Sequence, residues 1–332
     1  MLKKIAILTS GGDSPGMNPA IRSITRTAIN QNIKVLGILN GYQGIFDREF
    51  IPLDILEVSG KIRDAGTFLG TSRCKEFRSQ EGQQEALKIL REQDIHALIV
   101  IGGDGSLTGA QCLHNLGFPV IGLPGTIDND LYGTDMAIGV DTCLNTIISL
   151  VDMTKMTAAS HKRCFVIEVM GRRSGYLALM SSITTGSQVA VIPEYRVNMD
   201  KILASLERRV QRKHNNAVVV VAEGVCGGQE FVDRMLQLGE NRIKLEVRLT
   251  VLGHVQRGGA PTHFDRLLAS RMGEMAVLAL QHGETGCMVA LSQGKMQLRD
   301  FEHILGRKKT LPADAIRLAR NIGVEIGDPV EL

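Results

Sequence analysis

Two carboxylates and a hydroxyl lie close together between Thr126 and Asp130, directly after the apolar run 120–123. The carboxyl end of a buried strand is where open α/β sheets carry their chemistry. An Asp-x-Asp pair, here Asp128 and Asp130, suits a general base, a metal ligand or both. An Asx-rich turn that only leaves the strand is the alternative, and this segment alone does not decide between the two.

Two glycine-rich loops have the composition of phosphate-binding turns. Residues 10–18 read Ser-Gly-Gly-Asp-Ser-Pro-Gly-Met-Asn, and residues 102–106 read Gly-Gly-Asp-Gly-Ser. Each follows an apolar run and leads into a helix-like segment, so backbone N–H groups and a helix N-terminus could together hold an anion. Asp104 in the second loop is a suitable Mg²⁺ ligand beside phosphate oxygens. Neither loop is a Walker A or G-x-G-x-x-G motif, and a tight glycine turn is the alternative.

Several arginines flank predicted strands or glycines. Arg163 comes just before one apolar run and Arg172 just after it, Arg248 precedes another run, and Arg73 follows Gly-Thr-Ser. Arginine binds phosphate through two parallel hydrogen bonds, so this placement favours an anionic substrate. Each arginine taken alone is typical of a solvated surface. Glu223, which closes a further apolar run, is either an acceptor for sugar hydroxyls or a surface carboxylate.

Apolar runs alternate with amphipathic segments along the chain, which predicts βαβ units and mostly parallel sheets. Asn18 is the expected N-cap of the first helix, with Pro19 at its first position. We expect buried strands at residues 4–8, 35–39, 97–101, 120–123, 164–169, 189–192, 217–222 and 249–252. We expect helices at residues 18–31, 80–93, 106–116, 141–156, 200–213 and 261–282.

Composition disfavours several classes of function. The chain has 332 residues, enough for two domains, and no apolar run approaches the roughly 20 residues that span a bilayer. A net charge of +3, no tryptophan and 4% aromatic residues argue against a nucleic-acid partner. The six cysteines lack CxxC spacing, which indicates reduced thiols and a cytoplasmic location rather than zinc or a disulfide framework.

The combination of Gly-Gly-Asp-Gly-Ser, Pro-Gly-Thr-Ile-Asp-Asn-Asp and Gly-His-Val-Gln-Arg-Gly-Gly, in this order, resembles the phosphofructokinase family. The match runs from Thr9 to Arg266 and is nearest to the bacterial, ATP-dependent members. It implies an α/β fold of two interleaved Rossmann-like three-layer domains with mostly parallel sheets. The expected domains are a larger ATP- and Mg-binding one at 1–139 plus 252–302, and a smaller sugar-phosphate-binding one at 140–251 plus 303–332.

The resemblance also implies the reaction and its participants. The γ-phosphoryl group of ATP would pass to the 1-hydroxyl of fructose 6-phosphate in glycolysis, giving fructose 1,6-bisphosphate and ADP. Mg²⁺ would be the cofactor. The protein would be a homotetramer whose active sites are shared between subunits, with no membrane or nucleic-acid partner.

Roles for individual residues follow from the same resemblance. Asp128 would take the proton from the sugar hydroxyl, and Thr126 and Arg172 would hold the transferring phosphoryl group. Asp104 would bind Mg²⁺, with Asp130 as a nearby charge. Other ATP contacts would come from Gly12, Arg73, Cys74, Gly103, Gly105 and Ser106. Other sugar-phosphate contacts would come from Ile127, Met170, Gly171, Glu223, His254, Val255, Gln256 and Arg257, with Arg163 and Arg248 reaching the 6-phosphate from a neighbouring subunit.

Two glycines indicate the phosphoryl donor. Relatives that use pyrophosphate typically carry Asp where this chain has Gly105 and Lys where it has Gly125. A side chain at 105 would fill the space of the nucleotide α-phosphate. We therefore expect ATP as the donor.

The effector site of the family is matched only in part. Gln188 stands where regulated relatives have Glu, His214 replaces a Lys, and Ile55 and Leu56 replace a common Arg-Tyr pair. Losing the Glu removes a cation ligand, so we expect weak or altered effector control. Basic residues match the family's effector positions at Arg22, Arg26, Lys155 and Arg212.

Three other functions are alternatives. A pyrophosphate-dependent phosphofructokinase is disfavoured by the two glycines. Another kinase with a Gly-Gly-Asp-Gly turn, acting on NAD or a lipid, would leave the set of arginines and His254 unexplained. A non-catalytic sugar-phosphate-binding subunit would be expected to lose Asp104 or Asp128, and both are present. A Rossmann dehydrogenase would carry a fingerprint that this chain lacks.

Overall fold

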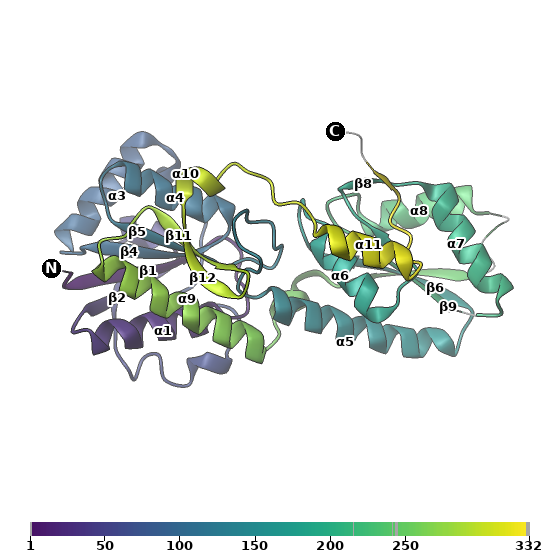
Figure 1. The fold of residues 1–332 in the computed structure, drawn as a ribbon, viewed down its shortest axis with the longest axis horizontal. Coiled ribbons are helices and arrows are strands. Elements are labelled where there is room, and N and C mark those ends of the chain that lie inside the picture. The colour runs from purple at the N-terminus through teal and green to yellow at the C-terminus, as the bar shows by residue number, and fades with distance from the viewer. Residues whose placement is uncertain (1, 215, 241, 243–244, 330–332) are drawn as a thin grey trace. The chain divides into compact units, whose positions relative to one another are not determined.

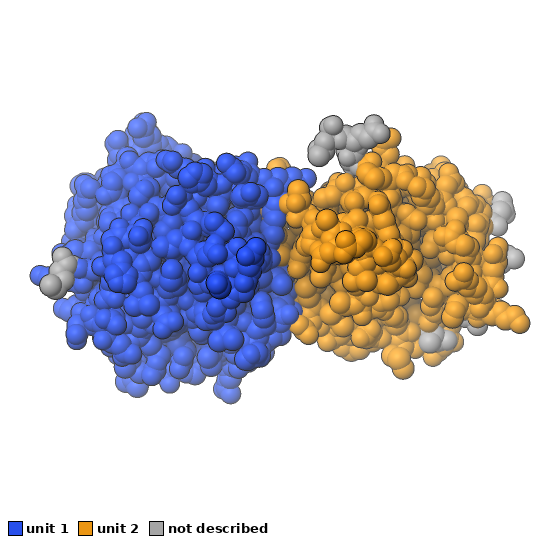
Figure 2. Space-filling model, viewed as in Figure 1, with its two compact units in different colours: residues 1–127, 131–142, 257–309 blue, residues 128–130, 143–256, 310–332 orange. Residues whose placement is uncertain are grey.

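The chain forms two compact units, coloured separately in Figure 2. The computed structural model describes all residues except 1, 215, 241, 243–244 and 330–332. Unit 1 comprises residues 1–127, 131–142 and 257–309, and unit 2 comprises residues 128–130, 143–256 and 310–332. The chain therefore changes unit within the Thr126–Asp130 segment. It changes again after residues 142, 256 and 309, where the sequence-based boundaries were 139, 251 and 302.

Unit 1 is built on a seven-stranded sheet in the order β12-β11-β5-β4-β1-β2-β3. Neighbouring strands from β11 to β2 pair in parallel, and only the edge strands β12 and β3 pair antiparallel with their neighbours. Every residue of β4 and β5 is buried, as expected for parallel strands covered on both faces. The strands are β1 (Lys4–Ser10), β2 (Lys34–Ile38), β3 (Phe50–Leu53), β4 (Ala97–Gly102), β5 (Val120–Pro124), β11 (Cys287–Ser292) and β12 (Lys295–Asp300).

Helices cover both faces of this sheet, and β1 shows how (Figure 1). Ile5 and Ile7 belong to a core cluster with residues of α1 and α9, whereas Ala6 and Leu8 belong to a cluster with residues of α3 and α4. The period-2 alternation of the strand thus assigns one pair of helices to each face. The helices are α1 (Met17–Asn30), α2 (Gln43–Phe46), α3 (Gln80–Glu92), α4 (Asp104–Asn115), α9 (His263–Gln281) and α10 (Phe301–Ile304), with short 3₁₀ turns η1 (Lys61–Arg63) and η2 (Glu76–Arg78).

Unit 2 is built on a parallel four-stranded sheet in the order β10-β6-β9-β7. Its strands are β6 (Arg163–Val169), β7 (Val189–Val191), β9 (Asn216–Ala222) and β10 (Glu246–Val251), and β8 (Tyr195–Arg196) pairs separately with β13 (Asp328–Pro329). Side chains of α7 and α8 share one core cluster with the sheet, while α6 packs on β7 and β9, and α11 packs on α6. The helices are α5 (Val140–Ala159), which begins in unit 1, α6 (Tyr176–Thr185), α7 (Met199–Gln211), α8 (Gly228–Leu238) and α11 (Ala313–Asn321), with the 3₁₀ turn η3 (Gly253–Arg257).

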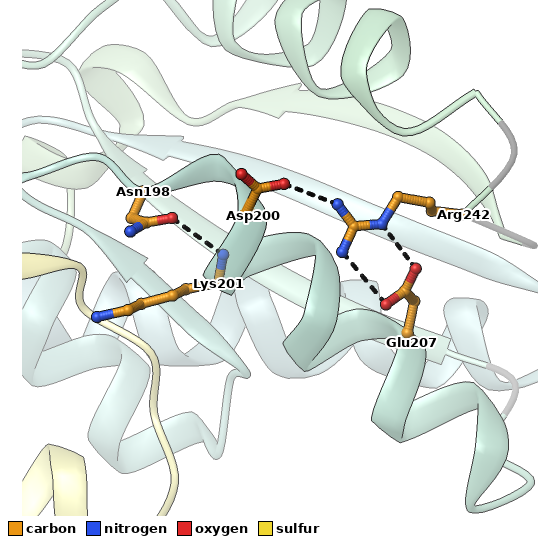
Figure 3. A network of polar contacts seen from close by, with 5 residues as sticks. All are labelled: Asn198, Asp200, Lys201, Glu207 and Arg242. Atoms are coloured by element: carbon orange, nitrogen blue, oxygen red, sulfur yellow. Dashed lines mark hydrogen bonds and ion pairs between the residues drawn. The ribbon is translucent and has the colours of Figure 1, made fainter.

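Helix α7 begins at a side-chain cap, whereas helix α1 does not begin at the cap expected from the sequence. The Asn198 side chain caps α7 by accepting a hydrogen bond from the Lys201 N–H at 3.1 Å (Figure 3). The expected Asn18 cap is wrong. Helix α1 begins at Met17, two residues before the expected first position Pro19 and after Gly16 with φ of 115°, and the Asn18 carboxamide instead accepts a hydrogen bond from the Phe68 N–H at 2.9 Å.

The predicted α/β class with mostly parallel sheets is confirmed. Each expected strand and each expected helix corresponds to an element of the structure, with ends shifted by a few residues. Among the described residues, no helix combines the length and the apolar character needed to cross a membrane.

Candidate functional site

Three loops of unit 1 begin at neighbouring positions on the carboxyl edge of its sheet. In the parallel register Ser10 pairs with Gly102, and Gly102 pairs with Pro124. Strands β1, β4 and β5 therefore end level with one another. The two glycine-rich loops and the start of the Thr126–Asp130 segment therefore leave the sheet side by side.

Small residues let these loops touch. The Gly125 N–H donates to the Gly102 carbonyl at 3.0 Å, which joins the third loop to the second. A Cβ atom built on Gly103 would lie 3.7 Å from the Thr126 Cβ, and one built on Gly11 would lie 3.3 Å from the Ser106 Oγ. The structure thus brings together Gly11, Gly103, Ser106 and Thr126 in one patch, where the loops after β1, β4 and β5 meet.

Arg257 joins this patch from a distant part of the sequence. Its guanidinium donates a hydrogen bond to the Asp13 carbonyl. A Cβ atom on Gly12 would lie 2.5 Å from the Arg257 Nη1, so glycine is what allows the guanidinium to lie against this loop. Arg257 was expected among the sugar contacts and Gly12 among the ATP contacts, and the structure places the two side by side.

Two buried side chains that the sequence analysis did not single out support these loops. The Tyr42 hydroxyl donates to the Ser106 carbonyl at 2.8 Å, and its ring stacks on Phe77. Burial raises the pKa of Tyr42 well above its ordinary value, which keeps it a donor. The Thr9 hydroxyl donates to the Gly70 carbonyl at 2.9 Å and so holds the segment that leads to Arg73.

Asp104 is the first residue of α4, and its side chain is exposed. Within the described part of the chain, no three His, Cys, Asp or Glu side chains are grouped so that they could hold a metal ion. A single exposed carboxylate beside a glycine-rich loop still fits Mg²⁺, which commonly takes one or two carboxylates and completes its shell with water and phosphate oxygens. Burial is the main cause of a raised pKa at Cys74, so its thiol stays protonated at neutral pH.

The segment after β5 stays largely buried as far as Asn129. Ile127 is fully buried, Asp128 is 9% exposed and Asn129 is 2% exposed. Asn129 adopts the left-handed conformation with φ of 49°, which Asn tolerates better than most residues. The chain thus turns sharply at the residue after the expected base, Asp128.

In unit 2 the expected sugar contacts also follow the carboxyl ends of strands. The Arg172 N–H donates to the Glu223 Oε1 at 2.9 Å, which joins the loop after β6 to the end of β9. The buried Gln256 side chain accepts from the Met170 N–H at 3.1 Å and donates to the Gly253 carbonyl at 2.9 Å. Gln256 therefore holds two loops together and is not exposed for a ligand, in contrast to Arg172. The side chains of Glu223, His254 and Val255 are exposed beside these loops, and Gly171 lies buried between Met170 and Arg172.

Arg163 and Arg248 lie away from this group, in the amino-terminal halves of strands. Arg163 opens β6, and Glu246, its register partner, opens β10 two residues before Arg248. Arg163 Nε lies 2.8 Å from the Glu246 Oε2, and the Arg248 guanidinium also pairs with this carboxylate. The hydrogen bond from Arg163 is the main reason why the pKa of Glu246 is lowered. The length of β6 separates Arg163 from the loop that carries Arg172 by about 20 Å.

The expected effector residues are divided between the two units. Arg22 and Arg26 lie on α1 of unit 1. In unit 2, Lys155 donates to the Thr185 carbonyl, and Arg212 lines a cavity of about 450 Å³ with Arg208, Arg209 and His214. The Gln188 carboxamide borders the same cavity, but its oxygen accepts from the Val218 N–H at 2.7 Å and its nitrogen donates to the Gly186 carbonyl at 3.0 Å.

Comparisons with known proteins give a consistent result. A family model described as phosphofructokinase matches residues 4–280. The ATP-dependent 6-phosphofructokinase of Shouchella clausii is 46% identical over 323 residues, which cover 97% of this chain and 100% of that protein. The ATP-dependent 6-phosphofructokinase of Bacillus subtilis is 44% identical over the same shares of the two chains.

Solved structures agree on the fold. The phosphofructokinase of Saccharomyces cerevisiae superposes with a TM-score of 0.85 at 34% identity, over 96% of this chain and 50% of that chain. The chain thus spans half the length of the yeast protein. A pyrophosphate-dependent phosphofructokinase of Marinobacter aquaeolei superposes with a TM-score of 0.84 at 21% identity, over 100% of this chain and 94% of that chain, which is a likeness of fold alone.

Proposed function

This chain belongs to the phosphofructokinase family, and we propose that it transfers the γ-phosphoryl group of ATP to the 1-hydroxyl of fructose 6-phosphate. The products are fructose 1,6-bisphosphate and ADP, as in glycolysis. The observation that carries the proposal is identity of 44–46% over 97% of the chain to ATP-dependent 6-phosphofructokinases. The alignment of the three loop-bearing strands β1, β4 and β5 at one sheet edge supports it.

Phosphoryl transfer needs positioning and charge neutralisation more than covalent chemistry by the protein. Asp128 accepts the proton of the 1-hydroxyl as the sugar oxygen attacks the γ-phosphorus and the bond to the ADP oxygen breaks. Thr126 and Arg172 hold the phosphoryl oxygens during transfer. Backbone N–H groups of the loops at Gly12 and Gly103 bind the ATP phosphates, supported by the α4 N-terminus.

Asp104 would hold Mg²⁺, and the ion, when bound, neutralises charge on the phosphates of ATP. Its place in the first turn of α4 puts the carboxylate beside Gly105 and Ser106, in the same loop that is assigned to ATP. Asp130 adds negative charge on the segment after β5. Arg73 and Cys74 complete the ATP contacts that we assign.

Gly105 and Gly125 support ATP over pyrophosphate as the donor. A Cβ atom on Gly105 would meet nothing within 4 Å, so the space is open to the nucleotide. A Cβ atom on Gly125 would lie 3.0 Å from the Ile101 Cγ2 and 3.1 Å from the Met17 Cε, so a larger residue would displace its neighbours.

A homotetramer with shared active sites is part of the proposal. Arg163 and Arg248 are assigned to the sugar 6-phosphate, whereas Arg172 is assigned to the transferring phosphoryl group and Glu223 to the sugar. Their positions at opposite ends of the strands support delivery of Arg163 and Arg248 from a neighbouring subunit. We place the enzyme in the cytoplasm, which agrees with six free cysteines.

We also propose weak or altered effector control. The Gln188 carboxamide has its oxygen and its nitrogen engaged by backbone groups, so it offers a cation no carboxylate ligand. Phosphoenolpyruvate should therefore shift the fructose 6-phosphate saturation curve little. A large cooperative shift would overturn this part of the proposal.

The test of the function is a coupled assay with ATP, Mg²⁺ and fructose 6-phosphate, comparing wild type with Asp128→Ser. A positioned base contributes roughly 10²–10⁴-fold, so kcat should fall by that factor. Asp152→Ser, at an exposed position on α5, is the matched control and should keep wild-type kcat. Wild-type kcat in the Asp128 variant would refute the assignment of Asp128 as the base. Faster turnover with pyrophosphate than with ATP would refute ATP as the phosphoryl donor.

A further inference from the structure

A fully buried carboxylate, that of Asp265, joins the first turns of two helices in unit 1. Its Oδ1 accepts from the Gly139 N–H at 2.9 Å, and its Oδ2 accepts from the Thr142 N–H at 2.8 Å and the Thr142 hydroxyl at 2.5 Å. Gly139 directly precedes α5, and Asp265 lies in the first turn of α9. The carboxylate thus satisfies N–H groups of α5 that have no partner within that helix.

The two helices cap each other. In an ordinary capping box, the third residue of a helix accepts from the N–H of its own capping residue. Here the third residue of α9, Asp265, accepts from Gly139 at the start of α5. The Thr142 hydroxyl, on the third residue of α5, accepts from the N–H of Thr262, the cap of α9, at 3.0 Å. A further bond of 2.6 Å runs from the Thr262 hydroxyl to Asp141.

The phosphate-binding loop after β1 rests on this junction. A Cβ atom on Gly16 would lie 3.6 Å from the Asp265 Cβ, and one on Gly139 would lie 2.7 Å from the Ser14 Cβ. The Ser14 hydroxyl is buried and has no hydrogen-bond partner among the described residues. This part of the loop is therefore held by packing against the start of α5 rather than by its own side chain.

The same junction reaches the loop by a second route. Helix α1, which follows the loop, packs along α9, and the Ser23 hydroxyl donates to the Ser270 carbonyl at 2.7 Å. Arg257, which lies against Gly12, comes five residues before the α9 cap, Thr262. A shift of the α9 start would therefore move both ends of the loop 11–16.

We propose that Asp265 is a positioning residue for catalysis. It holds the phosphate-binding loop 11–16 in place through the hydrogen bonds by which α5 and α9 cap each other. The proposal rests on the proposed function, because it assigns this loop to the phosphates of ATP. Asp265 touches no substrate in this account. It acts through Gly139, Thr142 and the packed residues Ser14 and Gly16.

The hydrogen-bonding groups around position 265 explain why a carboxylate suits this position better than an amide. Burial is the main reason why the pKa of Asp265 is raised to about 6, so its ionised form, although it predominates at neutral pH, costs more free energy than that of an exposed aspartate. An asparagine would avoid that cost, but its amide has one acceptor oxygen and two donor hydrogens. It would turn an N–H toward the N–H of Gly139 or of Thr142 and leave a buried donor unpaired.

The experiment compares wild type with Asp265→Asn in four measurements: Tm, affinity for a non-hydrolysable ATP analogue with Mg²⁺, kcat/KM for ATP, and hydrogen exchange in the peptide covering residues 11–18. We expect affinity and kcat/KM for ATP to fall roughly tenfold, because small misplacements of binding groups have large effects. Exchange in this peptide should quicken. Asp314→Asn, in the first turn of α11, is the control and should change none of these values.

Two outcomes would overturn the proposal. One is a lower Tm for Asp265→Asn with unchanged affinity and unchanged exchange in residues 11–18, which would make Asp265 a stabilising cap only. The other is wild-type behaviour in all four measurements. If Asp265→Asn does not fold, Thr142→Val removes one bond to the carboxylate and the acceptor of the Thr262 N–H, and it should give the same changes at smaller size. Failure of wild type to phosphorylate fructose 6-phosphate would refute the function, while the exchange measurement would still test the positioning.

Discussion

The loops of unit 1 and the arginine-bearing strands of unit 2 are held in place by different physical means. In unit 1, backbone bonds, glycine contacts and the buried carboxylate of Asp265 set the positions of the loops. In unit 2, Arg163 and Arg248 are set by exposed ion pairs with Glu246. Buried groups are insensitive to salt and intolerant of substitution, whereas exposed ion pairs are weak and screened. Substitutions at the loops of unit 1 should thus have large effects on activity and stability. Substitutions at the ion pairs of unit 2 should have smaller effects that depend on salt concentration.

The largest effect is expected for Gly12→Ala. The new methyl group would push the Arg257 guanidinium away from the Asp13 carbonyl, and a long side chain can yield without unfolding the protein. We expect kcat/KM for fructose 6-phosphate to fall about 100-fold with little change in Tm. Gly227→Ala, at a glycine whose Cβ would meet nothing within 4 Å, is the control. A fall in kcat/KM of less than about threefold, within the range of ordinary surface changes, would contradict the expectation that substitutions in the loops of unit 1 have large effects.

The next effect concerns pH and Asp265. Its pKa is raised from 3.8 to about 6 in the folded state, mainly by burial and slightly by the facing carboxylate of Asp141. Between these values the folded protein binds more protons than the unfolded one, so this group lowers stability as pH rises through the folded pKa, and the change is complete about one pH unit above it. Asparagine does not titrate. From pH 4.5 to 7.5, the stability of Asp265→Asn relative to wild type should therefore increase by roughly 2 kcal/mol.

Unfolding by urea at the two pH values measures this difference. Because the comparison is between two proteins at each pH, titration of the other carboxylates cancels. Parallel stability profiles for wild type and Asp265→Asn would contradict the assignment of a buried, ionised carboxylate to the loop support of unit 1.

A smaller effect is expected for Glu246→Gln in unit 2. The carboxylate pairs with two arginines that we assign to the sugar 6-phosphate, so it competes with that anion. Without it, KM for fructose 6-phosphate should fall roughly two- to fivefold at low salt, and the difference should shrink at 1 M salt. Glu230→Gln, at an exposed position on α8, is the control. A rise in KM would show that Glu246 orients the arginines instead of competing with the substrate.

The smallest effect is expected for Arg242→Gln. Arg242 pairs with Asp200 at 2.9 Å and with Glu207 at 2.8 Å on the surface of unit 2 (Figure 3). Exposed pairs of this kind contribute little, so Tm should fall by no more than about 4 °C and kinetic constants should not change. A drop in kcat would mean that this surface ion pair of unit 2 affects the active site, which would contradict the small effect expected for exposed pairs.

Much of the fold was predictable because buried parallel strands are short, continuous apolar runs. The antiparallel edge strands β3 and β12 were not assigned, since edge strands alternate only weakly and β12 is largely polar. Helix α6 was not assigned either, because it is buried nearly all round and shows no amphipathic period. Asn18 was misplaced because its side chain bonds a segment about 50 residues away, which local propensity does not encode.

The candidate site was predictable where residues lie on loops at strand ends. The likeness to bacterial, ATP-dependent relatives is confirmed by the full-length matches. The roles of individual residues, including Asp128 and Arg172, remain predictions. The supporting roles of Tyr42 and Asp265 carried no sequence signal, although Asp265 lies inside the matched stretch that ends at Arg266, because a buried Tyr and an Asp in a first helical turn are ordinary features. Their contacts depend on strands and helices that meet only after folding.

The interleaving of unit 1 has a consequence for synthesis on the ribosome. Strand β5 pairs with β11, and α1 packs on α9, although β11 and α9 are made long after β5. At about 5–20 residues per second, the apolar edge of β5 waits on the order of 10 to 30 s for its neighbour. During that interval the nascent chain must expose a strand edge that the finished protein buries, so its yield in a cell depends on whatever shields this edge during translation.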